Sequence, residues 1–346
     1  MERVKAVALY SGGLDSTLAI KLIQKQGIDI LAVHFYTGFC ITETKRRRGE
    51  KREDGTSYIN PALKYAAKYK FPIEIVDISE GYLNVITSPK YGYGSNVNPC
   101  IDCRIYMFKK AKEIMEEIGA KFVITGEVLG QRPMSQHLQA MKIIERDSGL
   151  EGLVLKPLSA KRLQPTIPEI EGWVDRDKLE GIVGRSRKRQ IELLKQLGID
   201  EFEHPGGGCC YLTDENYAKK YREAVKIESR ITMEDLTLLT VGRHFRLPAK
   251  TKLIVSRNEG ENNFLYGFRS RYHFFEVIGK GPIVLAKPFS VDHIPEEDLS
   301  IIPDIIGRYS KLEDGKIDIL YSDPSGEEMV LTGRGIEDRV LEGWRI

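Results

Sequence analysis

The chain has 346 residues, more than the roughly 250 to 300 at which a single hydrophobic core stops growing, so we expect two domains. With 41% hydrophobic and 29% charged residues, the composition excludes a disordered tail and a fibrous repeat. The net charge of +2 divides unevenly, because residues 291–346 carry 6 basic against 14 acidic side chains and the other residues carry 46 against 36. No apolar stretch approaches the roughly 18 residues of a membrane span, so we expect a cytoplasmic protein without membrane association.

The first 125 residues alternate between apolar runs and helical patterns. Apolar runs cover residues 4–10, 28–36, 73–78 and 122–125, and helical patterns cover residues 15–26, 61–69 and 104–118. Runs of Val and Ile that are separated by helices are typical of parallel strands buried on both faces. The predicted fold class is therefore α/β, with a parallel sheet and helices on both of its faces.

The pattern changes towards the C-terminus. Residues 176–197 have a helical pattern with a break at Gly184, and residues 214–227 have another helical pattern. Short alternating runs then follow at residues 252–256, 272–278, 283–286 and 316–321, separated by Gly, Pro and Asn. We therefore predict a first domain at residues 1–228 and a smaller α+β domain at residues 229–346.

The turn between the first strand and the first helix reads Ser11-Gly12-Gly13-Leu14-Asp15-Ser16. Two glycines allow a tight turn whose N–H groups approach an anion, and the helix N-terminus adds unpaired amides. The Ser hydroxyls can donate to phosphate oxygens, whereas a carboxylate at Asp15 would repel phosphate unless Mg²⁺ lies between them. We therefore expect a phosphate loop with a metal-facing Asp15. The alternative is an ordinary turn in which Ser or Asp caps the helix.

The cysteines number five, and an odd number in a cytosolic-looking chain argues against a disulfide framework. They are Cys40, Cys100, Cys103, Cys209 and Cys210. Cys100 and Cys103 lie at the start of a predicted helix, where the amides and Arg104 are expected to lower a thiol pKa. The second pair follows three glycines, whereas Cys40 has no partner in sequence and is interpreted as ordinary. Iron-sulfur ligation, zinc, persulfide or disulfide chemistry and inert thiols all remain open on these residues.

The turn motif resembles the S-G-G-x-D-S loop of the PP-loop ATP pyrophosphatase superfamily, and the resemblance extends over about residues 5–227. Members of that superfamily bind ATP, adenylate a carbonyl or carboxyl oxygen, release pyrophosphate and let a nucleophile displace AMP. The resemblance implies ATP and Mg²⁺ as cofactors, with Asp15 also in a catalytic role. The implied cofactor-binding residues of the loop are Ser11, Gly12, Gly13, Asp15 and Ser16.

The cysteines add a second resemblance, because cluster-dependent tRNA thiolases of this superfamily use a C-x-x-C and one distant Cys. The segment Cys210-Tyr211-Leu212 is similar to the distant C-[FY]-[IL] of 2-thiouridylases. This resemblance implies a 4Fe-4S cluster held by Cys100, Cys103 and Cys210, with Cys209 as the other candidate metal ligand. The cluster would leave one iron to carry hydrosulfide, and a persulfide on Cys100 is the alternative sulfur source.

Residues 125–131 read Thr-Gly-Glu-Val-Leu-Gly-Gln at the end of a predicted strand, where parallel sheets bind ligands. They resemble the T-G-E-x-L-G-Q segment of tRNA 4-thiouridine synthetases, which implies that Gly126, Glu127 and Gln131 contact ATP or uridine. In that family Ser-Gln follows shortly. Here Ser135 and Gln136 come one residue late, so their roles are not transferred.

The C-terminal third resembles the RNA-binding domain of NFACT proteins, at residues 238–247 and 256–262. Its cations alternate with aromatic side chains, which suits phosphate pairing and the stacking of unpaired bases. The predicted patch contains Arg243, Arg246, Lys250, Lys252, Arg257, Arg269 and Arg271 with Phe245, Tyr266 and Phe268. Two basic runs, at residues 45–52 and 185–189, either neutralise phosphates or are solvated surface.

These features together predict an ATP-dependent tRNA sulfurtransferase that thiolates a uridine. The uridine carbonyl oxygen would attack the α-phosphate of ATP, and sulfur would then displace AMP. The expected partners are tRNA and a sulfur donor, either sulfide or a cysteine desulfurase, and a homodimer is left open. The alternatives are an adenylating enzyme of the amide-forming or lysidine type and a non-catalytic RNA-binding protein that senses ATP.

Overall fold

The structure, a computed structural model, describes residues 3–51, 55–202, 210–311 and 313–346. The chain divides into two compact units. The first contains Met1–Glu43 and Tyr58–Thr213, and the second contains Thr44–Ser57 and Asp214–Ile346. The predicted boundary at residues 228 and 229 stays a prediction for the functional domains.

The first unit is built on a five-stranded sheet in the order β3-β2-β1-β4-β5, with all neighbours parallel. The strands are β1 (Lys5–Leu9), β2 (Asp29–Tyr36), β3 (Ile73–Asp77), β4 (Phe122–Thr125) and β5 (Val154–Leu155). The central strands β1 and β4 are almost entirely buried, because helices cover both faces of the sheet. The predicted α/β class is confirmed.

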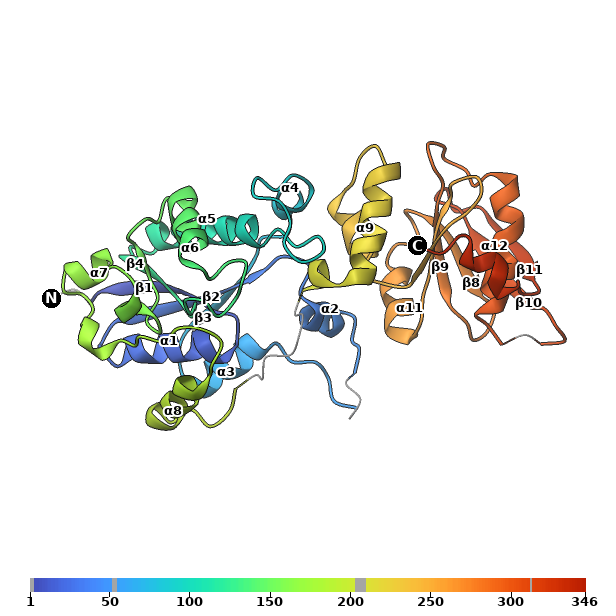
Figure 1. The fold of residues 1–346 in the computed structure, drawn as a ribbon. Coiled ribbons are helices and arrows are strands. Elements are labelled where there is room, and N and C mark those ends of the chain that lie inside the picture. The colour runs from blue at the N-terminus through green and yellow to red at the C-terminus, as the bar shows by residue number, and fades with distance from the viewer. Residues whose placement is uncertain (1–2, 52–54, 203–209, 312) are drawn as a thin grey trace. The chain divides into compact units, whose positions relative to one another are not determined.

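Two helical layers enclose this sheet (Figure 1). One hydrophobic core joins the sheet to α1 (Leu14–Gln24), α3 (Pro61–Tyr69) and α8 (Lys188–Leu197). A second core joins the opposite face to α5 (Cys100–Glu117) and α6 (Leu138–Ser148). The alternation of Ala6 and Ala8 with Val7 and Leu9 supplies both cores from one strand. The unit also contains the short helices α4 (Tyr82–Thr87) and α7 (Ile167–Ile170).

The connection between β2 and α3 leaves the first unit. Helix α2 (Ile41–Arg47) starts in the first unit, but residues 44–57 belong to the second. Arg48 is 7% exposed, and its Nη2 donates to the Thr240 hydroxyl. Its guanidinium also lies 4.9 Å from the Phe264 ring centroid and 3.6 Å from a Glu50 carboxylate oxygen. One cation of the basic run at 45–52 is therefore a buried structural group rather than a phosphate ligand.

The second unit contains a six-stranded antiparallel sheet in the order β11-β10-β8-β9-β7-β6. Its strands are β6 (Arg243–Arg246), β7 (Lys252–Val255), β8 (His273–Val277), β9 (Ile283–Lys287), β10 (Ile317–Ser322) and β11 (Glu328–Gly333). Its helices are α9 (Glu215–Ile227), α10 (Met233–Leu238), α11 (Glu259–Tyr266), α12 (Glu296–Arg308) and α13 (Asp338–Glu342).

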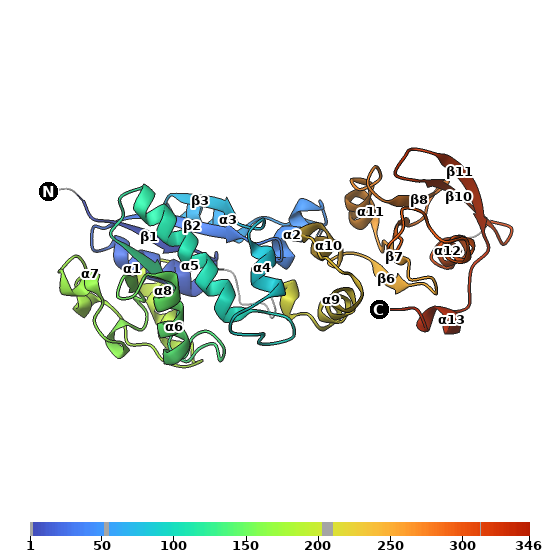
Figure 2. The same cartoon turned by 90° about the horizontal axis from the view of Figure 1, so that it is seen from above.

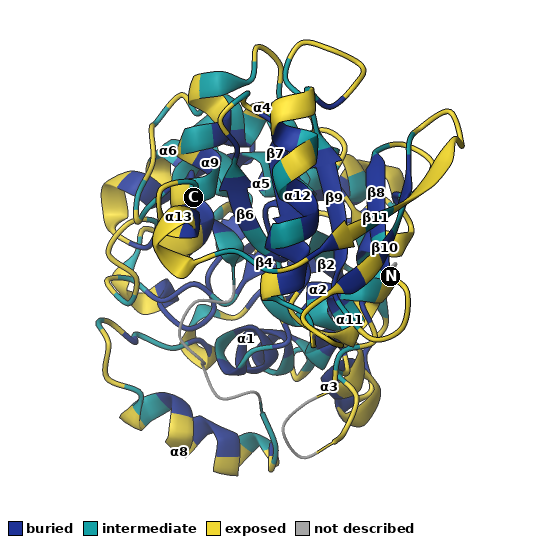
Figure 3. Ribbon diagram, turned by 90° about the vertical axis from the view of Figure 1, so that its right-hand side faces the viewer, coloured by how far each residue is buried: buried dark blue, intermediate teal, exposed yellow. Residues whose placement is uncertain are grey.

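Alternating residues of these strands feed two cores. Leu253 and Val255 pack with α12, whereas Ile254 packs with α10 and α11. Figure 2 shows α11 and α12 on opposite sides of β7 and β8. Most of α12 is buried or half-buried (Figure 3), and its exposed residues lie in its first two turns and at its last residue, namely Glu296, Glu297, Ser300 and Arg308.

Most predicted elements are confirmed, and α3 and β4 have the predicted bounds. The helical prediction for residues 176–197 is half wrong. Only the 3₁₀ turn Arg176–Lys178 and α8 are helical there, and Gly184 has a φ of +83°. Val183 instead pairs with Leu129 in an isolated parallel β-bridge, and the Gly184 N–H donates to the Leu129 carbonyl. Among the described residues, no helix combines the length and apolar composition that a membrane crossing requires.

Candidate functional site

The predicted phosphate loop connects β1 to α1. Gly12 has a φ of +80°, and a Cβ added there would lie 2.7 Å from the Ala62 backbone nitrogen, so only glycine fits. Gly13 is the N-cap of α1 and makes no side-chain cap hydrogen bond. The Ser16 hydroxyl donates to the Gly13 carbonyl at 3.0 Å and lies 3.2 Å from the exposed Ser11 hydroxyl. The first amides of α1 are thus left without a side-chain cap, as an anion site requires.

The end of β4 meets the start of α1. A Cβ at Gly126 would lie 2.4 Å from the Ser16 nitrogen and 2.6 Å from the Asp15 carbonyl carbon. Gly126 therefore allows a close backbone approach between the two predicted motifs, for which any side chain is too large. This packing places the segment 125–132 beside the phosphate loop.

Asp15 is held on one side only. Its Oδ2 accepts a hydrogen bond from Gln131 Nε2 at 2.6 Å, and Gln190 Nε2 donates to Gln131 Oε1 at 3.2 Å. The other carboxylate oxygen, Asp15 Oδ1, is buried and has no hydrogen-bond partner among the described residues. Because Mg²⁺ prefers carboxylate oxygens, this orphaned oxygen fits the predicted metal-facing role.

Glu127 is engaged inside the protein. It is 3% exposed, forms an ion pair with Arg104 at 2.5 Å and accepts from the Thr125 hydroxyl at 3.1 Å. Burial by itself raises the pKa of Glu127, but the cations of Arg104 and Lys156 and the hydrogen bonds hold that pKa below its ordinary value. Glu127, which was predicted to contact ATP or uridine, thus forms an ion pair that links the segment after β4 to the N-terminal part of α5.

The cysteines gather around one buried phenol. Tyr82 on α4 is 1% exposed, and burial raises the pKa of Tyr82 well above its ordinary value. Cys103, which shares a hydrogen bond with the hydroxyl, raises the pKa of Tyr82 further, and Cys210 and Cys100 act in the same direction. The backbones of Cys40 and Cys210 pair in an isolated antiparallel β-bridge, which no sequence pattern indicated. Cys209 lies outside the described residues.

The thiol pKa prediction is wrong for Cys100. Burial raises the pKa of Cys100 above its ordinary value, although Arg132, a backbone hydrogen bond and Arg104 act to lower it. The sequence showed the helix N-terminus and the arginine but not how deeply the thiol is buried. Desolvation of the thiolate therefore outweighs the nearby positive charge.

A metal centre requires several ligating side chains within reach of one ion. Within residues 3–51, 55–202, 210–311 and 313–346, no group of three His, Cys, Asp or Glu side chains could hold a metal ion. The Tyr82 hydroxyl is hydrogen-bonded to Cys103, one of the predicted ligands. The described thiols as arranged here therefore form no three-residue ligand set for an iron-sulfur cluster, and Cys209, the other candidate ligand, lies outside the described residues.

Sequence reasoning missed three residues of this region. Tyr82 lies on a short helix without a motif, and Arg132 directly follows the T-G-E-x-L-G-Q segment. Gln190 is fully buried on α8. Only Gln190 left a signal, because it occupies the apolar stripe that Leu193 and Leu194 continue at helical spacing.

The predicted RNA patch is largely paired within its own unit. Arg246 binds Glu223 and Glu228, Arg257 binds Glu261, Arg269 binds Glu328, and Arg271 binds Glu234. Phe245 and Phe268 are core residues, whereas Tyr266 is 48% exposed. Tyr266, with the Arg269 guanidinium 5.9 Å from its ring centroid, is thus the aromatic member that can stack on a base.

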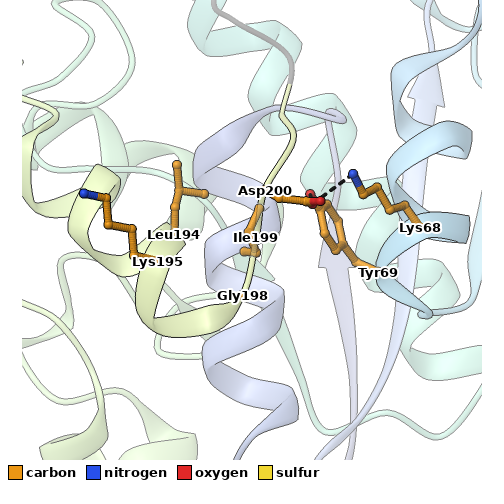
Figure 4. A pocket seen from close by; sticks show the side chains of 7 residues that line it. All are labelled: Lys68, Tyr69, Leu194, Lys195, Gly198, Ile199 and Asp200. Atoms are coloured by element: carbon orange, nitrogen blue, oxygen red, sulfur yellow. Dashed lines mark hydrogen bonds and ion pairs between the residues drawn. The ribbon is translucent and has the colours of Figure 1, made fainter.

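A surface cleft lies away from these motifs (Figure 4). It is lined by Lys68, Tyr69, Leu194, Lys195, Gly198, Ile199 and Asp200, at the C-terminal ends of α3 and α8. The Lys68 ammonium is 2.9 Å from Asp200 and 3.0 Å from Glu201. Because its central cation is already paired and it contains no predicted site residue, the cleft is not the candidate site.

Two protein families match separate parts of the chain. Residues 2–163 match the family described as thiamine biosynthesis protein (ThiI), and residues 242–345 match the one described as NFACT protein RNA binding domain. The two matches fall in the first and the second compact unit, apart from the residues 44–57 that the second unit takes up.

Individual relatives match part of the chain. The chain is 31% identical over 154 residues to the probable tRNA sulfurtransferase of Thermococcus kodakarensis, covering 44% of this chain and 36% of that protein. It is 27% identical over 232 residues to the tRNA-specific 2-thiouridylase MnmA of Clostridium perfringens, covering 65% and 60%. It is 26% identical over 252 residues to the probable tRNA sulfurtransferase of Methanothermobacter thermautotrophicus, covering 72% and 54%. The chain thus spans less than two thirds of the length of each of these relatives.

Among solved structures, a 4-thiouridine synthetase in complex with RNA and bound ATP aligns with 57% of this chain and 52% of its own. The identity is 22% and the TM-score is 0.33, which is below the level that indicates a shared fold.

Proposed function

We propose that this chain belongs to the PP-loop tRNA thiolation family, carries a C-terminal NFACT-type RNA-binding domain and is an ATP-dependent tRNA uridine thiolase. The proposed substrate is a tRNA uridine, and the proposed place of action is the cytoplasm. The sulfur donor, either sulfide or a cysteine desulfurase, and a homodimeric state belong to the same proposal.

One observation carries the proposal. Two consecutive residues reach both halves of the chemistry, because Gln131 donates to Asp15 at the phosphate loop and Arg132 lies close enough to Cys100 to act on its pKa. The Glu127 to Arg104 ion pair ties the same segment to the first turn of the cysteine helix. An enzyme that activates a base with ATP and then delivers sulfur needs these two groups in one site.

The activation step uses the phosphate loop. The α1 amides and the hydroxyls of Ser11 and Ser16 bind the departing pyrophosphate, with Gly12 and Gly13 allowing the close approach. Mg²⁺, held by Asp15, would neutralise the charge that develops on the phosphates. The uridine carbonyl oxygen attacks the α-phosphate and becomes an adenylate, whose leaving group is AMP.

The sulfur step is assigned to the thiols around Tyr82. A persulfide on Cys100 forms when a persulfide of the cysteine desulfurase passes its outer sulfur to the Cys100 thiolate. It attacks the activated carbon and AMP leaves, and Cys103 then attacks the Cys100 sulfur to release the thiolated base. This leaves a Cys100–Cys103 disulfide that an external thiol must reduce. The 4Fe-4S cluster on Cys100, Cys103 and Cys210, with Cys209 as the other candidate ligand, remains the alternative sulfur carrier, and its iron content is directly measurable.

The test compares cysteine variants in the full chain. Wild type, Cys100→Ala and Cys103→Ala are assayed for tRNA thiolation and for ATP–pyrophosphate turnover, with Cys40→Ala, at a cysteine outside the C-x-x-C pair, as the control. We expect both site variants to lose thiolation and keep turnover, and Cys40→Ala to keep both. Full thiolation by Cys100→Ala and Cys103→Ala would overturn the roles proposed for these two cysteines. ATP–pyrophosphate turnover by the wild type without any thiolated tRNA would overturn the proposed function and favour an amide-forming or lysidine-type adenylating enzyme.

The same preparations decide the sulfur carrier. Anaerobic purification followed by iron and sulfide analysis is expected to give iron-free, active protein if the thiols act alone. About four irons per chain that disappear in Cys100→Ala would establish the cluster instead. RNA binding without any ATP turnover would point to a non-catalytic ATP sensor.

A further inference from the structure

We propose that Gln190 is a positioning residue for Asp15, acting through Gln131. This inference rests on the proposed function in one respect, namely that Asp15 faces Mg²⁺ in the ATP complex. It adds a residue from α8, about 60 positions beyond the motif that contains Gln131 and outside every motif of the sequence.

Gln190 is placed where a leucine would be expected. It is 0% exposed and continues the buried stripe of Leu193 and Leu194, with which α8 packs against α1. A buried amide has four hydrogen-bonding positions to satisfy, so it is a poor choice for packing alone. Its Nε2 is used on Gln131, whereas its own Oε1 has no partner among the described residues.

The direction of the hydrogen bonds follows from Asp15. An ionised carboxylate only accepts, so Gln131 must present its Nε2 to Asp15, at 2.6 Å, and its Oε1 to the opposite side. That oxygen then needs a donor, and Gln190 Nε2 supplies it at 3.2 Å. Gln190 thus prevents the Gln131 amide from turning over and facing Asp15 with its oxygen.

The consequence for the site is a fixed carboxylate. Asp15 Oδ2 is committed to Gln131, and Oδ1 is the oxygen left for a cation. If the Gln131 amide turned over, its oxygen would face the Asp15 carboxylate and its Nε2 would face Gln190 Nε2. Two acceptors would then meet at Asp15 and two donors would meet at Gln190. Gln190 therefore sets the geometry of a metal ligand that it does not itself touch.

The other charged groups on the neighbouring elements already form hydrogen bonds or ion pairs, or act on Cys100. Lys21 on α1 donates to the Tyr69 carbonyl at 2.6 Å, and Glu127 is paired with Arg104. On α8, Arg189 is paired with Glu180 at 2.8 Å and with Glu192 at 3.2 Å. Arg132 is the further cation of the segment, and it acts on Cys100. Asp15 is therefore the charged group to which the Gln190–Gln131 pair is directly hydrogen-bonded.

The decisive variant is Gln190→Glu, with Gln190→Met as the control of similar size that lacks both donor and charge. An introduced carboxylate cannot donate to Gln131 Oε1, and it attracts the Gln131 amide in the wrong direction. We expect Mg²⁺- or Mn²⁺-dependent ATP binding by Gln190→Glu to weaken about tenfold or more near pH 8 and to recover towards about pH 5, where a buried carboxyl gains the proton that it can donate. Gln190→Met is expected to lose a smaller, pH-independent factor.

Binding is measured calorimetrically on the full chain, with Mn²⁺ and a non-hydrolysable ATP analogue and again with the analogue in EDTA. Circular dichroism confirms that each variant is folded at both pH values. If Gln190→Glu binds like wild type at every pH, or weakens equally with metal and in EDTA without recovery at low pH, the inference is overturned.

Asp15→Asn separates this inference from the proposed function. If Asp15→Asn keeps the full metal-dependent part of ATP binding, the metal role of Asp15 is wrong and the Gln190 inference fails with it. If Asp15→Asn loses that part while Gln190→Glu does not, the proposed role of Asp15 stands and only the Gln190 inference fails.

Discussion

At the residue scale, the least expected group is Lys252. It lies between Arg246 and Lys287 in the register of three neighbouring strands, and both of these neighbours are ion-paired. Lys252 itself is 6% exposed and forms no ion pair with any described residue. Burial lowers the pKa of Lys252 to about 8, although Glu223, Glu228 and Asp235 act to raise it and Arg246 lowers it further. It was predicted as an RNA contact, but it is a buried cation within the sheet.

The sign of its pH effect follows from this lowered pKa. Between about pH 8 and the unfolded value of 10.5, the unfolded chain binds more protons, so the free energy of unfolding of the second unit rises with pH. Lys252→Met removes the buried charge, and we expect it to stabilise this unit by about 1 to 3 kcal/mol at pH 7, with the gain vanishing near pH 10.5.

This prediction can be read out unit by unit, because Trp173 lies in the first unit and Trp344 in the second. Urea unfolding is followed by the fluorescence of Trp344 in a Trp173→Phe background. Lower stability of Lys252→Met at pH 7 would contradict the prediction, since a paired or ligand-holding lysine would behave in that way.

At the element scale, the segment 44–57 lies in the connection between β2 and α3 but belongs to the second unit. We therefore expect the stability of the second unit to depend on this connection. Arg48 is buried in the second unit against Thr240 and Phe264. We expect Arg48→Ala to destabilise the second unit by about 2 to 4 kcal/mol, because it removes a buried charged hydrogen bond and a cation–π contact. The exposed neighbour Arg47 is the matched control, and Arg47→Ala should cost less than about 1 kcal/mol.

The same tryptophan variants report the result. The Trp344 signal should shift to lower urea in Arg48→Ala, while the Trp173 signal in a Trp344→Phe background should stay in place. A shift of the Trp173 transition alone would assign the segment to the first unit instead.

At the scale of the whole molecule, the proposed RNA binding cannot depend on net charge. The net charge is only +2, residues 291–346 are acidic, and four cations of the predicted patch are ion-paired internally. We therefore expect stacking on Tyr266 to contribute more to tRNA binding than any single cation. Tyr266→Ala should weaken binding of the full chain by about 1 to 3 kcal/mol with an unchanged salt dependence.

Lys250→Ala provides the contrast, because Lys250 is an exposed cation of the predicted patch and loss of a phosphate contact should reduce the slope of log K against log salt by about one. Arg339→Ala, an exposed cation on α13, serves as the control for a general charge effect. Filter binding at several salt concentrations measures both quantities. A Tyr266→Ala variant that binds like wild type would remove Tyr266 from the RNA surface.

The sequence by itself determined the α/β class, most strands and helices, and the tight turn at residues 11–16, because these depend on local periodicity and on glycines that a tight turn requires. Tertiary structure decided which groups meet. Only packing shows that Gly126 lies against Ser16, that Glu127 pairs with Arg104, and that Cys100, Cys103 and Cys210 lie near Tyr82. It also decided charge states, since the depth of burial raises the pKa of Cys100 although its neighbours in sequence predict the reverse. Spacing along a chain reports neither depth nor distant partners, and desolvation and pairing depend on both.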